Sequence, residues 1–383
     1  MNLKQKQWID GNIGRIIAAI NVVLVRGLGI LLRRDHSINK PPENILIIKM
    51  LGIGSMFIAT DSIYSLKKKY PNAKFILMTS SSVAASMHPL QLFDEIWVHN
   101  DKNFIKLFVS GFELLLKTWK LKKLWVVDLE VYSVLSTIFS TYTLAINRFG
   151  FQLNKVHFRN YLNTHNIFFN QFTSVYLNYE MLVKAMGVSE ITPFIFEPLL
   201  INDKQKNTIA INNTCSELGG NLKKIPGATL QQLCLYIINN TNYNLAFTGA
   251  PVDFESNELF INNFLHQYKN RITNIAGVFN FDKYYEFLYN NCKAMISIDS
   301  APMHIAIKLG LPTLSFWGPV NPTQMLSANQ VSKQLHIYLG VHCSPCIHLT
   351  DVVPCGGNNI CMKNMNNELI EFYLNKLLDI IKV

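Results

Sequence analysis

The chain has 383 residues, a length that exceeds one ordinary domain and predicts two. Because 49% of the residues are hydrophobic and only 16% are charged, the composition argues against a disordered chain. The net charge of +10 is compatible with a nucleotide, a phospholipid surface or a nucleic acid, and does not choose among them. We expect a cytoplasmic protein for two reasons. The first apolar stretch is not followed by the small-residue cleavage site of a signal peptide, and the seven cysteines do not form a secreted scaffold.

The first apolar stretch covers residues 16–32 and is short for a membrane span, which needs ~20 residues. Arg15, Arg26 and Arg33 return to nearly the same face of a helix at their spacing. Two interpretations follow from this pattern. Either an amphipathic helix contacts a membrane surface through residues 13–34, or the helix packs on the protein's own core with its arginines in water.

Short aliphatic runs alternate with helical stretches in the first half of the chain. Residues 44–49 resemble a strand buried on both faces, and a loop with glycines and a helix over 57–70 follow it. Further strands are expected at 74–78, 96–98 and 124–127. This alternation predicts a parallel sheet with helices on both faces.

The same alternation restarts in the second half. Strands are expected at 208–211, 243–247, 294–298 and 311–316, with helices at 229–239, 282–291 and 303–309. The expected fold class is therefore α/β, with two doubly wound, Rossmann-like domains in tandem. The expected divisions are an amphipathic helical segment (1–40), a first domain (41–190), a second domain (205–366) and a last helix (367–383) that packs back on the first domain.

Two loops are candidates for ligand binding. The first contains Gly52 and Gly54, follows the strand at 44–49 and opens a helix, a place where backbone N–H groups favour anionic or polar ligands. The alternative is a tight turn without a ligand. The loop is not a dinucleotide fingerprint, because the third glycine is missing.

The second loop, Asp299-Ser300-Ala301-Pro302-Met303-His304, lies between a predicted strand and a predicted helix. Ser300, Ala301 and the first helical N–H groups are suited to a diphosphate, and Asp299 is suited to sugar hydroxyls. The alternative is that Asp299 and Ser300 cap the helix, with Pro302 at an early helical position.

These motifs resemble glycosyltransferase family 9, the heptosyltransferases of lipopolysaccharide assembly. The family's Asp-Ser/Thr-Gly-Pro/Leu-Met-His run, its Leu-Gly-x-Pro-Thr strand and its Phe-Gly-Pro turn correspond to residues 299–304, 309–313 and 316–319. In the first half, residues 47–71, 127–130 and 148–151 are similar to the family's opening strand and mid-domain signature. The resemblance covers the chain from about residue 44 onward.

The resemblance implies two facing Rossmann-like domains, the GT-B arrangement, and transfer with inversion from a nucleotide-diphosphate sugar. It implies ADP-heptose as donor, a lipopolysaccharide or other cell-surface glycan as acceptor, a position at the inner membrane face and no required cofactor. The implied donor-binding residues are Lys223, Thr248, Gly249, Asp299, Ser300, Ala301, Pro302, Met303 and His304, with Gly52 and Gly54 on the acceptor side. Lys223 corresponds to the family's phosphate-binding lysine, and its alternative is an exposed basic pair with Lys224.

Two departures from the family's pattern affect the chemistry. Ala301 replaces the glycine of the donor loop, and Ser55 stands where many members have an acidic residue proposed as general base. Asp128 and Glu130, at the end of a strand, are therefore the favoured carboxylates for that role, and Asp61 is expected to face solvent or its helix neighbours. A second hypothesis is a catalytically impaired homologue that binds nucleotide sugars or acts as a scaffold in the same pathway.

The C-terminal region contains Cys343, Cys346, Cys355 and Cys361. This spacing gives a candidate structural zinc site, and reduced thiols are the alternative. No basic stripe with interleaved aromatic residues is present in the sequence, so nucleic-acid binding is not expected.

Overall fold

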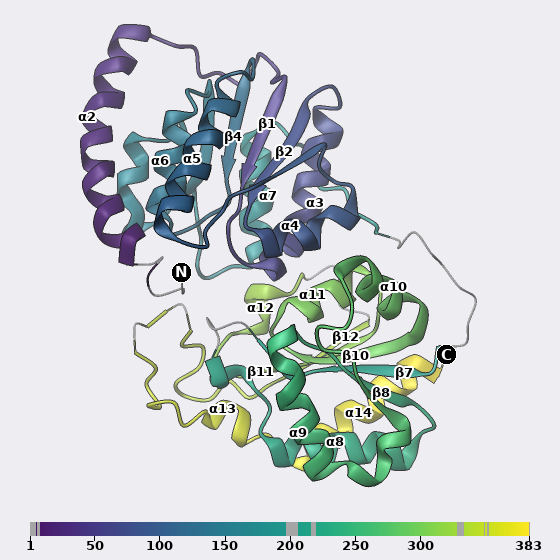
Figure 1. The fold of residues 1–383 in the computed structure, drawn as a ribbon. Helices are drawn as coiled ribbons and strands as arrows, with labels where there is room; N and C mark the ends of the chain where they lie inside the picture. The colour runs from purple at the N-terminus through teal and green to yellow at the C-terminus, as the bar shows by residue number, and fades with distance from the viewer. Residues whose placement is uncertain are drawn as a thin grey trace. The chain divides into compact units, whose positions relative to one another are not determined.

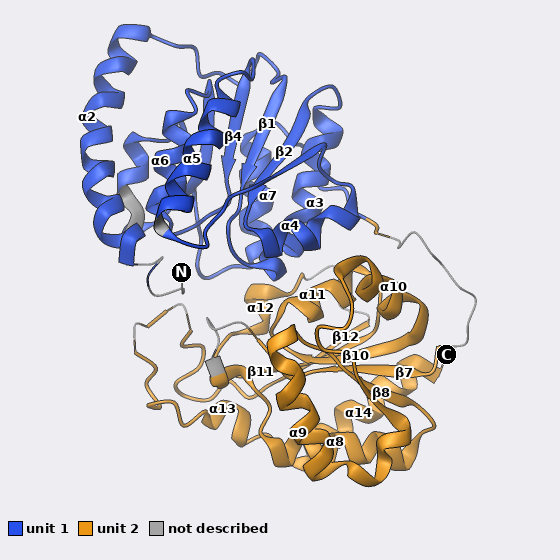
Figure 2. Ribbon diagram, viewed as in Figure 1, with its two compact units in different colours: residues 1–194 blue, residues 195–383 orange. Residues whose placement is uncertain are grey.

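The computed structural model of the chain describes residues 5, 8–196, 206–215, 220–327, 333–347, 349–350 and 352–382. The chain forms two compact units, residues 1–194 and residues 195–383 (Figure 2). Each unit contains a six-stranded parallel sheet with helices on its faces (Figure 1). The expected α/β class, with two doubly wound units, is therefore confirmed.

In the first unit the strands lie in the order β3-β2-β1-β4-β5-β6. The four strands predicted from the sequence are confirmed, whereas β5 and β6 were not predicted as strands. The strand bounds are β1 (Asn44–Ile48), β2 (Lys74–Thr79), β3 (Glu95–Val98), β4 (Leu124–Asp128), β5 (Asn147–Gln152) and β6 (His165–Phe168). The aliphatic residues of β1, β2 and β4 are buried on both faces, as the sequence pattern predicts.

Helices cover both faces of this sheet. Their bounds are α2 (Arg15–Leu32), α3 (Ile53–Lys69), α4 (Ser81–Met87), α5 (Phe104–Thr118), α6 (Val134–Tyr142) and α7 (Val175–Ala185). Helix α3 contacts α4 and α7, whereas α6 contacts α2 and α5 (Figure 1). Because crossovers between parallel strands are right-handed, α5 and α6 lie on the opposite face from α3 and α4.

In the second unit the strands lie in the order β12-β11-β10-β7-β8-β9. The strand bounds are β7 (Thr208–Asn212), β8 (Asn244–Phe247), β9 (Ile272–Asn274), β10 (Cys292–Ile298), β11 (Thr313–Trp317) and β12 (Gln334–Tyr338). The helix bounds are α8 (Gly227–Asn240), α9 (Phe254–Phe264), α10 (Phe281–Asn291), α11 (Ala301–Lys308), α12 (Pro322–Met325), α13 (Ile360–Lys363) and α14 (Asn367–Lys382).

The two sheets share one topology. When each unit's strands are counted from its own first strand, both sheets have the order 3-2-1-4-5-6 of doubly wound dinucleotide-binding folds. The strand order reverses between β1 and β4 in the first unit and between β7 and β10 in the second. Ligands of such sheets bind beyond the carboxyl ends of the strands at this switch point, so the loops after these four strands are the expected places for a site.

The last helix corrects one expectation. Helix α14 packs within its own unit, where it contacts α8, β10, β11 and β12. Its apolar side, which includes Ile370, Leu374 and Leu377, joins the hydrophobic core beneath that sheet. The helix was misassigned because an apolar stripe shows that a helix packs, without showing against which core.

Candidate functional site

The second unit places the predicted donor loop at its switch point. Strands β7 and β10 are neighbours, and their register pairs Asn212 with Ser297. Asp299 and Ser300 follow β10 directly, and α11 begins at Ala301. The loop therefore lies at the carboxyl edge of the sheet, in the position where doubly wound folds bind their ligands.

Asp299 is nearly buried and is held by two basic side chains. Its Oδ2 lies 2.5 Å from Lys223 Nζ, and its Oδ1 lies 3.9 Å from His304 Nε2. Burial alone would raise the pKa of this carboxyl, but Lys223 and a hydrogen bond from His304 hold the pKa well below its usual range. Lys223 itself is only 14% exposed, so its interpretation as part of an exposed basic pair is wrong.

Asn212 connects the polar residues of this edge, and the sequence analysis did not single it out. Its fully buried side chain donates from Nδ2 to the Ser300 hydroxyl (2.8 Å) and to the Thr214 carbonyl (3.0 Å). Its Oδ1 accepts from the Thr248 hydroxyl at 3.3 Å. Thr248 and Ser300, two predicted donor-binding residues from different strand ends, are thus joined by one amide.

The first turn of α11 is not capped by a side chain. Ser300 is the N-cap residue, yet within the described part of the chain its hydroxyl makes no capping hydrogen bond. Instead Ser300 Oγ contacts Asn212 and the carbonyl of Ile298. The interpretation of Asp299 and Ser300 as helix caps is therefore wrong, and the N–H groups of this helix start are left for an anion.

The last three residues of the loop are Pro302, which favours the start of the helix, and Met303 and His304, whose side chains are buried. Pro302 occupies the first turn of α11, where a missing N–H is tolerated. Met303 packs against Trp317, and His304 Nδ1 is buried without a hydrogen-bond partner among the described residues. The side chains of Met303 and His304 therefore shape the site from behind.

Gly249 follows Thr248 after β8 and allows a close approach of the chain. A Cβ at this position would lie 2.8 Å from Asp253 Cβ, which is closer than real Cβ contacts. Asp253 in turn accepts a hydrogen bond from the Ala250 N–H at 2.8 Å. The glycine is thus required by packing in this turn.

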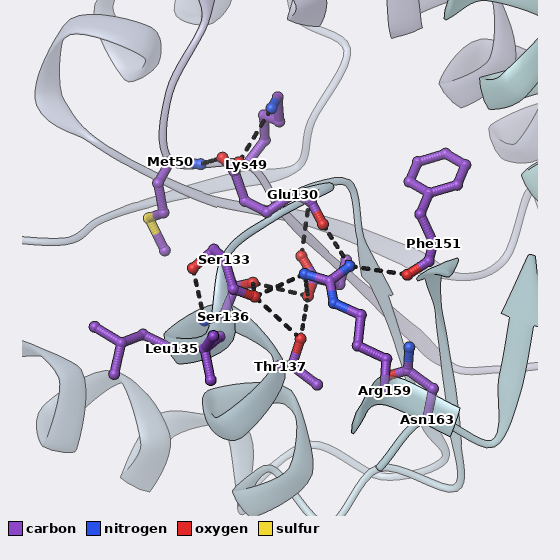
Figure 3. Close-up of polar contacts among 12 residues, drawn as sticks. Lys49, Met50, Glu130, Ser133, Leu135, Ser136, Thr137, Phe151, Arg159 and Asn163 are labelled. Carbon is purple, nitrogen blue, oxygen red and sulfur yellow. Dashed lines mark hydrogen bonds and ion pairs between the residues drawn. The ribbon is translucent and has the colours of Figure 1, made fainter. Parts of the chain in front are cut away.

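The first unit places the loop after β1 beside the loop after β4. Gly52 has φ of +89°, a left-handed conformation that favours glycine, and α3 begins at the next residue. Glu130 Oε1 accepts hydrogen bonds from the N–H groups of Met50 (2.7 Å) and Leu51 (3.1 Å), and Glu130 Oε2 lies 3.3 Å from Lys49 Nζ (Figure 3). Glu130 therefore fixes the shape of the acceptor-side loop.

Asp128, one of the two favoured carboxylates, is fully buried. Its Oδ2 accepts from Ser136 Oγ (2.8 Å) and Thr137 Oγ1 (3.3 Å) and lies 3.5 Å from the Arg159 guanidinium (Figure 3). Its Oδ1 accepts from the Glu130 N–H at 3.0 Å. These contacts disfavour Asp128 as general base, because a base must reach the proton of a substrate hydroxyl.

The other candidates for the base have different surroundings. Ser55 is partly exposed, and its hydroxyl donates to the Gly52 carbonyl at 2.8 Å. Asp61 is partly buried, and its carboxylate accepts from the Phe194 N–H at 2.7 Å. Glu130, whose side chain is 13% exposed, is the carboxylate beside the loop that retains contact with solvent.

The four C-terminal cysteines are free thiols, and Cys346 and Cys361 are buried. Burial raises the pKa of the Cys361 thiol to about 11. Among the described residues, no three His, Cys, Asp or Glu side chains are grouped so that they could hold a metal ion.

Residues 185–355 match the family model for glycosyltransferase family 9 (heptosyltransferase). This range includes Lys223, Thr248, Gly249 and the whole loop 299–304. The resemblance to glycosyltransferase family 9 is confirmed. Enzymes of this family are glycosyltransferases, and the chain is assigned to that class of enzyme. Among curated proteins, none matches the chain.

Solved structures share the fold of this chain. The E. coli ADP-heptose LPS heptosyltransferase II is 18% identical, with a TM-score of 0.68 over 89% of this chain and 100% of that one. A family 9 glycosyltransferase from Veillonella parvula is 17% identical, with a TM-score of 0.65 over 77% and 85%. E. coli heptosyltransferase WaaC with ADP-2-deoxy-2-fluoro heptose is 12% identical, with a TM-score of 0.65 over 87% and 99%.

Proposed function

We propose that this family 9 protein transfers a sugar, with inversion, from a nucleoside-diphosphate donor bound by the second unit. The observation that carries the proposal is the start of α11, whose N–H groups lie at the switch point without a side-chain cap and next to Lys223. Helix N-termini at this place in doubly wound folds bind diphosphates. Ala301, which replaces the family's glycine, leaves the backbone N–H in place.

Lys223 has two roles in this proposal. Before the donor binds, it neutralises Asp299 at 2.5 Å. During transfer, negative charge develops on the departing diphosphate, and a cation with a helix N-terminus stabilises that charge. Asp299, ionised because of its basic neighbours, holds the ammonium in position and offers a carboxylate to sugar hydroxyls.

The donor proposed first is ADP-heptose, and the acceptor is a lipopolysaccharide or another cell-surface glycan. The proposal is supported by the family match and by the names of the similar structures, one of an ADP-heptose heptosyltransferase and one with an ADP-sugar analogue bound. The alternative is a homologue that binds the donor without transferring its sugar, and Ser55 in place of an acidic residue is the observation that favours it.

A donor screen tests the proposed function. We expect ADP at ~100 times its Kd to stabilise the protein by about 2.7 kcal/mol, and UDP or GDP at the same concentration to stabilise it less. Differential scanning fluorimetry measures this shift, and acceptor-dependent release of the nucleoside diphosphate measures transfer. Stabilisation without release would select the non-catalytic alternative, and no stabilisation by any nucleotide would contradict both.

We propose Glu130 as the general base, since it is the carboxylate beside the acceptor-side loop with access to solvent. Glu130→Gln keeps an oxygen for the N–H groups of Met50 and Leu51 and removes the basicity. We expect kcat to fall by ~10²-fold or more, with an unchanged thermal shift with ADP. A fall of less than ~10-fold would give Glu130 a positioning role instead.

We also propose that the enzyme works at the cytoplasmic face of the membrane, with contact through α2. Residues 10–32 form one helix of 23 residues, the one among the described residues that is long and apolar enough to cross a bilayer. The helix packs on α6 through Gly14, Ala18 and Asn21, and Ile17 and Val22 pack beside them. Most of its other large apolar side chains are exposed. The core-packing interpretation therefore accounts for only one side of this helix.

A further inference from the structure

Helix α2 is fixed to the first unit along its length. Near its beginning, the Asp10 carboxylate accepts hydrogen bonds from the N–H groups of Val134 and Leu135 (both 2.9 Å) at the start of α6. Near its middle, Asn21 accepts from the Tyr142 hydroxyl at 2.7 Å, and further along the Arg26 guanidinium lies 4.0 Å over the Tyr161 ring. A helix held at these points lies along the protein surface.

The outward side of α2 is apolar. Eight of the helix's large aliphatic side chains are each 50–78% exposed. These are Ile16, Ile20, Val23, Leu24, Leu28, Ile30, Leu31 and Leu32. Because Ile17, Val22 and Val25 pack inward against the cluster formed with α6, the helix is apolar on its outward side as well, unlike an ordinary surface helix.

Helix α5 also presents large apolar side chains to solvent. Its buried side includes Leu114, Ser110 and Thr118, whereas Phe108, Val109 and Phe112 are 47–58% exposed. Ile105 and Leu116 extend the exposed apolar row at both ends of the helix. Two aromatic rings facing solvent on one helix are unusual unless another phase covers them.

The two helices flank α6 on one side of the sheet (Figure 1). Tyr142 at the end of α6 links them: its hydroxyl donates to Asn21 of α2, and its carbonyl accepts from the Trp119 indole after α5 at 2.8 Å. Trp119 and Tyr142 are themselves 51% and 40% exposed. Rings with one apolar part and one polar group are favoured at a membrane–water interface.

Basic residues border this apolar surface. Residues 101–123, which contain α5, carry six lysines against two acidic residues, and Arg33 and Arg34 follow the end of α2. A cavity of about 550 Å³ is lined by residues that follow both helices, including Arg34, Lys40, Lys123 and Trp119. Asp35 also lines it, 3.6 Å from Lys40, and Glu43 lies 2.8 Å from Lys123. Positive charge beside exposed apolar side chains matches a bilayer that contains anionic lipid.

We propose that α2 and α5 together form a docking surface for an anionic lipid bilayer, with lipid phosphates at the basic cavity. This inference extends the proposed membrane location from one helix to two and does not depend on which sugar is transferred. Insertion of both apolar rows would place α5, α6 and α2 against the membrane. The face of the sheet covered by α3, α4 and α7 would then lie away from the bilayer.

Matched pairs of exposed apolar residues test the docking surface by co-sedimentation with vesicles. The vesicles contain either phosphatidylcholine alone or equal parts of phosphatidylcholine and phosphatidylglycerol. Each pair is spaced four residues apart on its helix and is replaced by aspartate. The variants are Phe108→Asp/Phe112→Asp on α5, Ile20→Asp/Leu24→Asp on α2, and Leu177→Asp/Met181→Asp on α7 as control.

We expect the wild-type protein to bind the anionic vesicles more tightly than the neutral ones. The α5 pair and the α2 pair should each weaken this binding by at least ~10-fold, and the α7 pair should leave it unchanged. Loss in the α2 pair with full binding in the α5 pair would overturn the inference, as would equal loss in the α7 control. Self-association abolished by the α5 pair, without vesicle binding by the wild type, would also overturn it.

The thermal shift with ADP separates this inference from the proposed function, because the substituted residues lie in the first unit and the proposed donor site lies in the second. All three variants should keep the shift of the wild type. Weak vesicle binding with a normal ADP shift would count against the docking surface alone. A normal vesicle profile without any nucleotide response would count against the proposed function alone.

Discussion

Replacing Lys223 by methionine is expected to lower kcat for sugar transfer by at least ~10²-fold, the effect of losing one group that stabilises charge in a transition state. The same change leaves Asp299 buried without the cation at 2.5 Å. Breaking a buried ion pair from one side costs about 3–5 kcal/mol, so the single variant should also be less stable. Chemical denaturation and steady-state kinetics measure the two effects separately.

The pH dependence of the stability of this variant follows from the direction in which the pKa of Asp299 is shifted. In the wild type the depressed pKa of Asp299 stabilises the fold above the ordinary carboxyl pKa, and this stabilisation is lost as the pH falls through the depressed value. Without Lys223, the His304 side chain alone opposes the effect of burial, so the pKa of Asp299 rises from its depressed value and the charged carboxyl is less stable in the folded protein. The stability deficit of Lys223→Met should therefore be larger at pH 7 than at pH 4.

A double variant separates chemistry from stability. Lys223→Met/Asp299→Asn removes both charges and should recover most of the lost stability, because no uncompensated charge remains buried. Its transfer rate should stay at the level of the single variant. Recovery of transfer together with stability would contradict a role for Lys223 in binding the diphosphate.

The Asp128→Asn variant is expected to reduce stability by about 3 kcal/mol while leaving kcat of the folded enzyme within a few fold of wild type. Asp128 and Arg159 are both fully buried and 3.5 Å apart, so the neutral amide would leave the guanidinium without its counter-ion. Arg159 also donates hydrogen bonds to the carbonyls of Glu130 and Ser133. If the Arg159 side chain became disordered, the loop after β4 would lose these hydrogen bonds. Urea denaturation and kinetics at a temperature below the transition give the two numbers.

A general base contributes ~10²–10⁴-fold to the rate. A loss of kcat of that size in Asp128→Asn, with unchanged stability, would contradict the structural role and support Asp128 as the base. Arg159→Leu serves as the matched variant from the other side of the pair. It should be destabilised to a similar degree if the ion pair is what Asp128 contributes.

The sequence predicted the strand–loop–helix arrangement of residues 299–304 correctly because its signals are local. Residues 299–304 combine a strand end, a proline at the start of a helix and a short polar run, and each of these depends on near neighbours. Asn212 was missed because its importance comes from the register of β7 and β10, which brings together residues more than eighty positions apart. A polar residue at the end of a buried strand was the signal that could have found it.

The surroundings of Asp128 and of α14 could not be predicted for a related reason. A carboxylate at a strand end points to a site, but the presence of Arg159 beneath it depends on tertiary packing and not on the local pattern. The apolar stripe of α14 predicts burial without naming the partner. Phe108 and Phe112 are the opposite case. Large apolar residues at helical spacing ordinarily predict a buried helix face, yet both side chains are exposed.

A crystal structure with bound ADP tests the central claim most directly. The account predicts that the β-phosphate contacts the N–H groups at the start of α11 and the Lys223 ammonium, within the loop that begins at Asp299. A diphosphate bound elsewhere on the second unit, with the pair of Lys223 and Asp299 untouched, would contradict it.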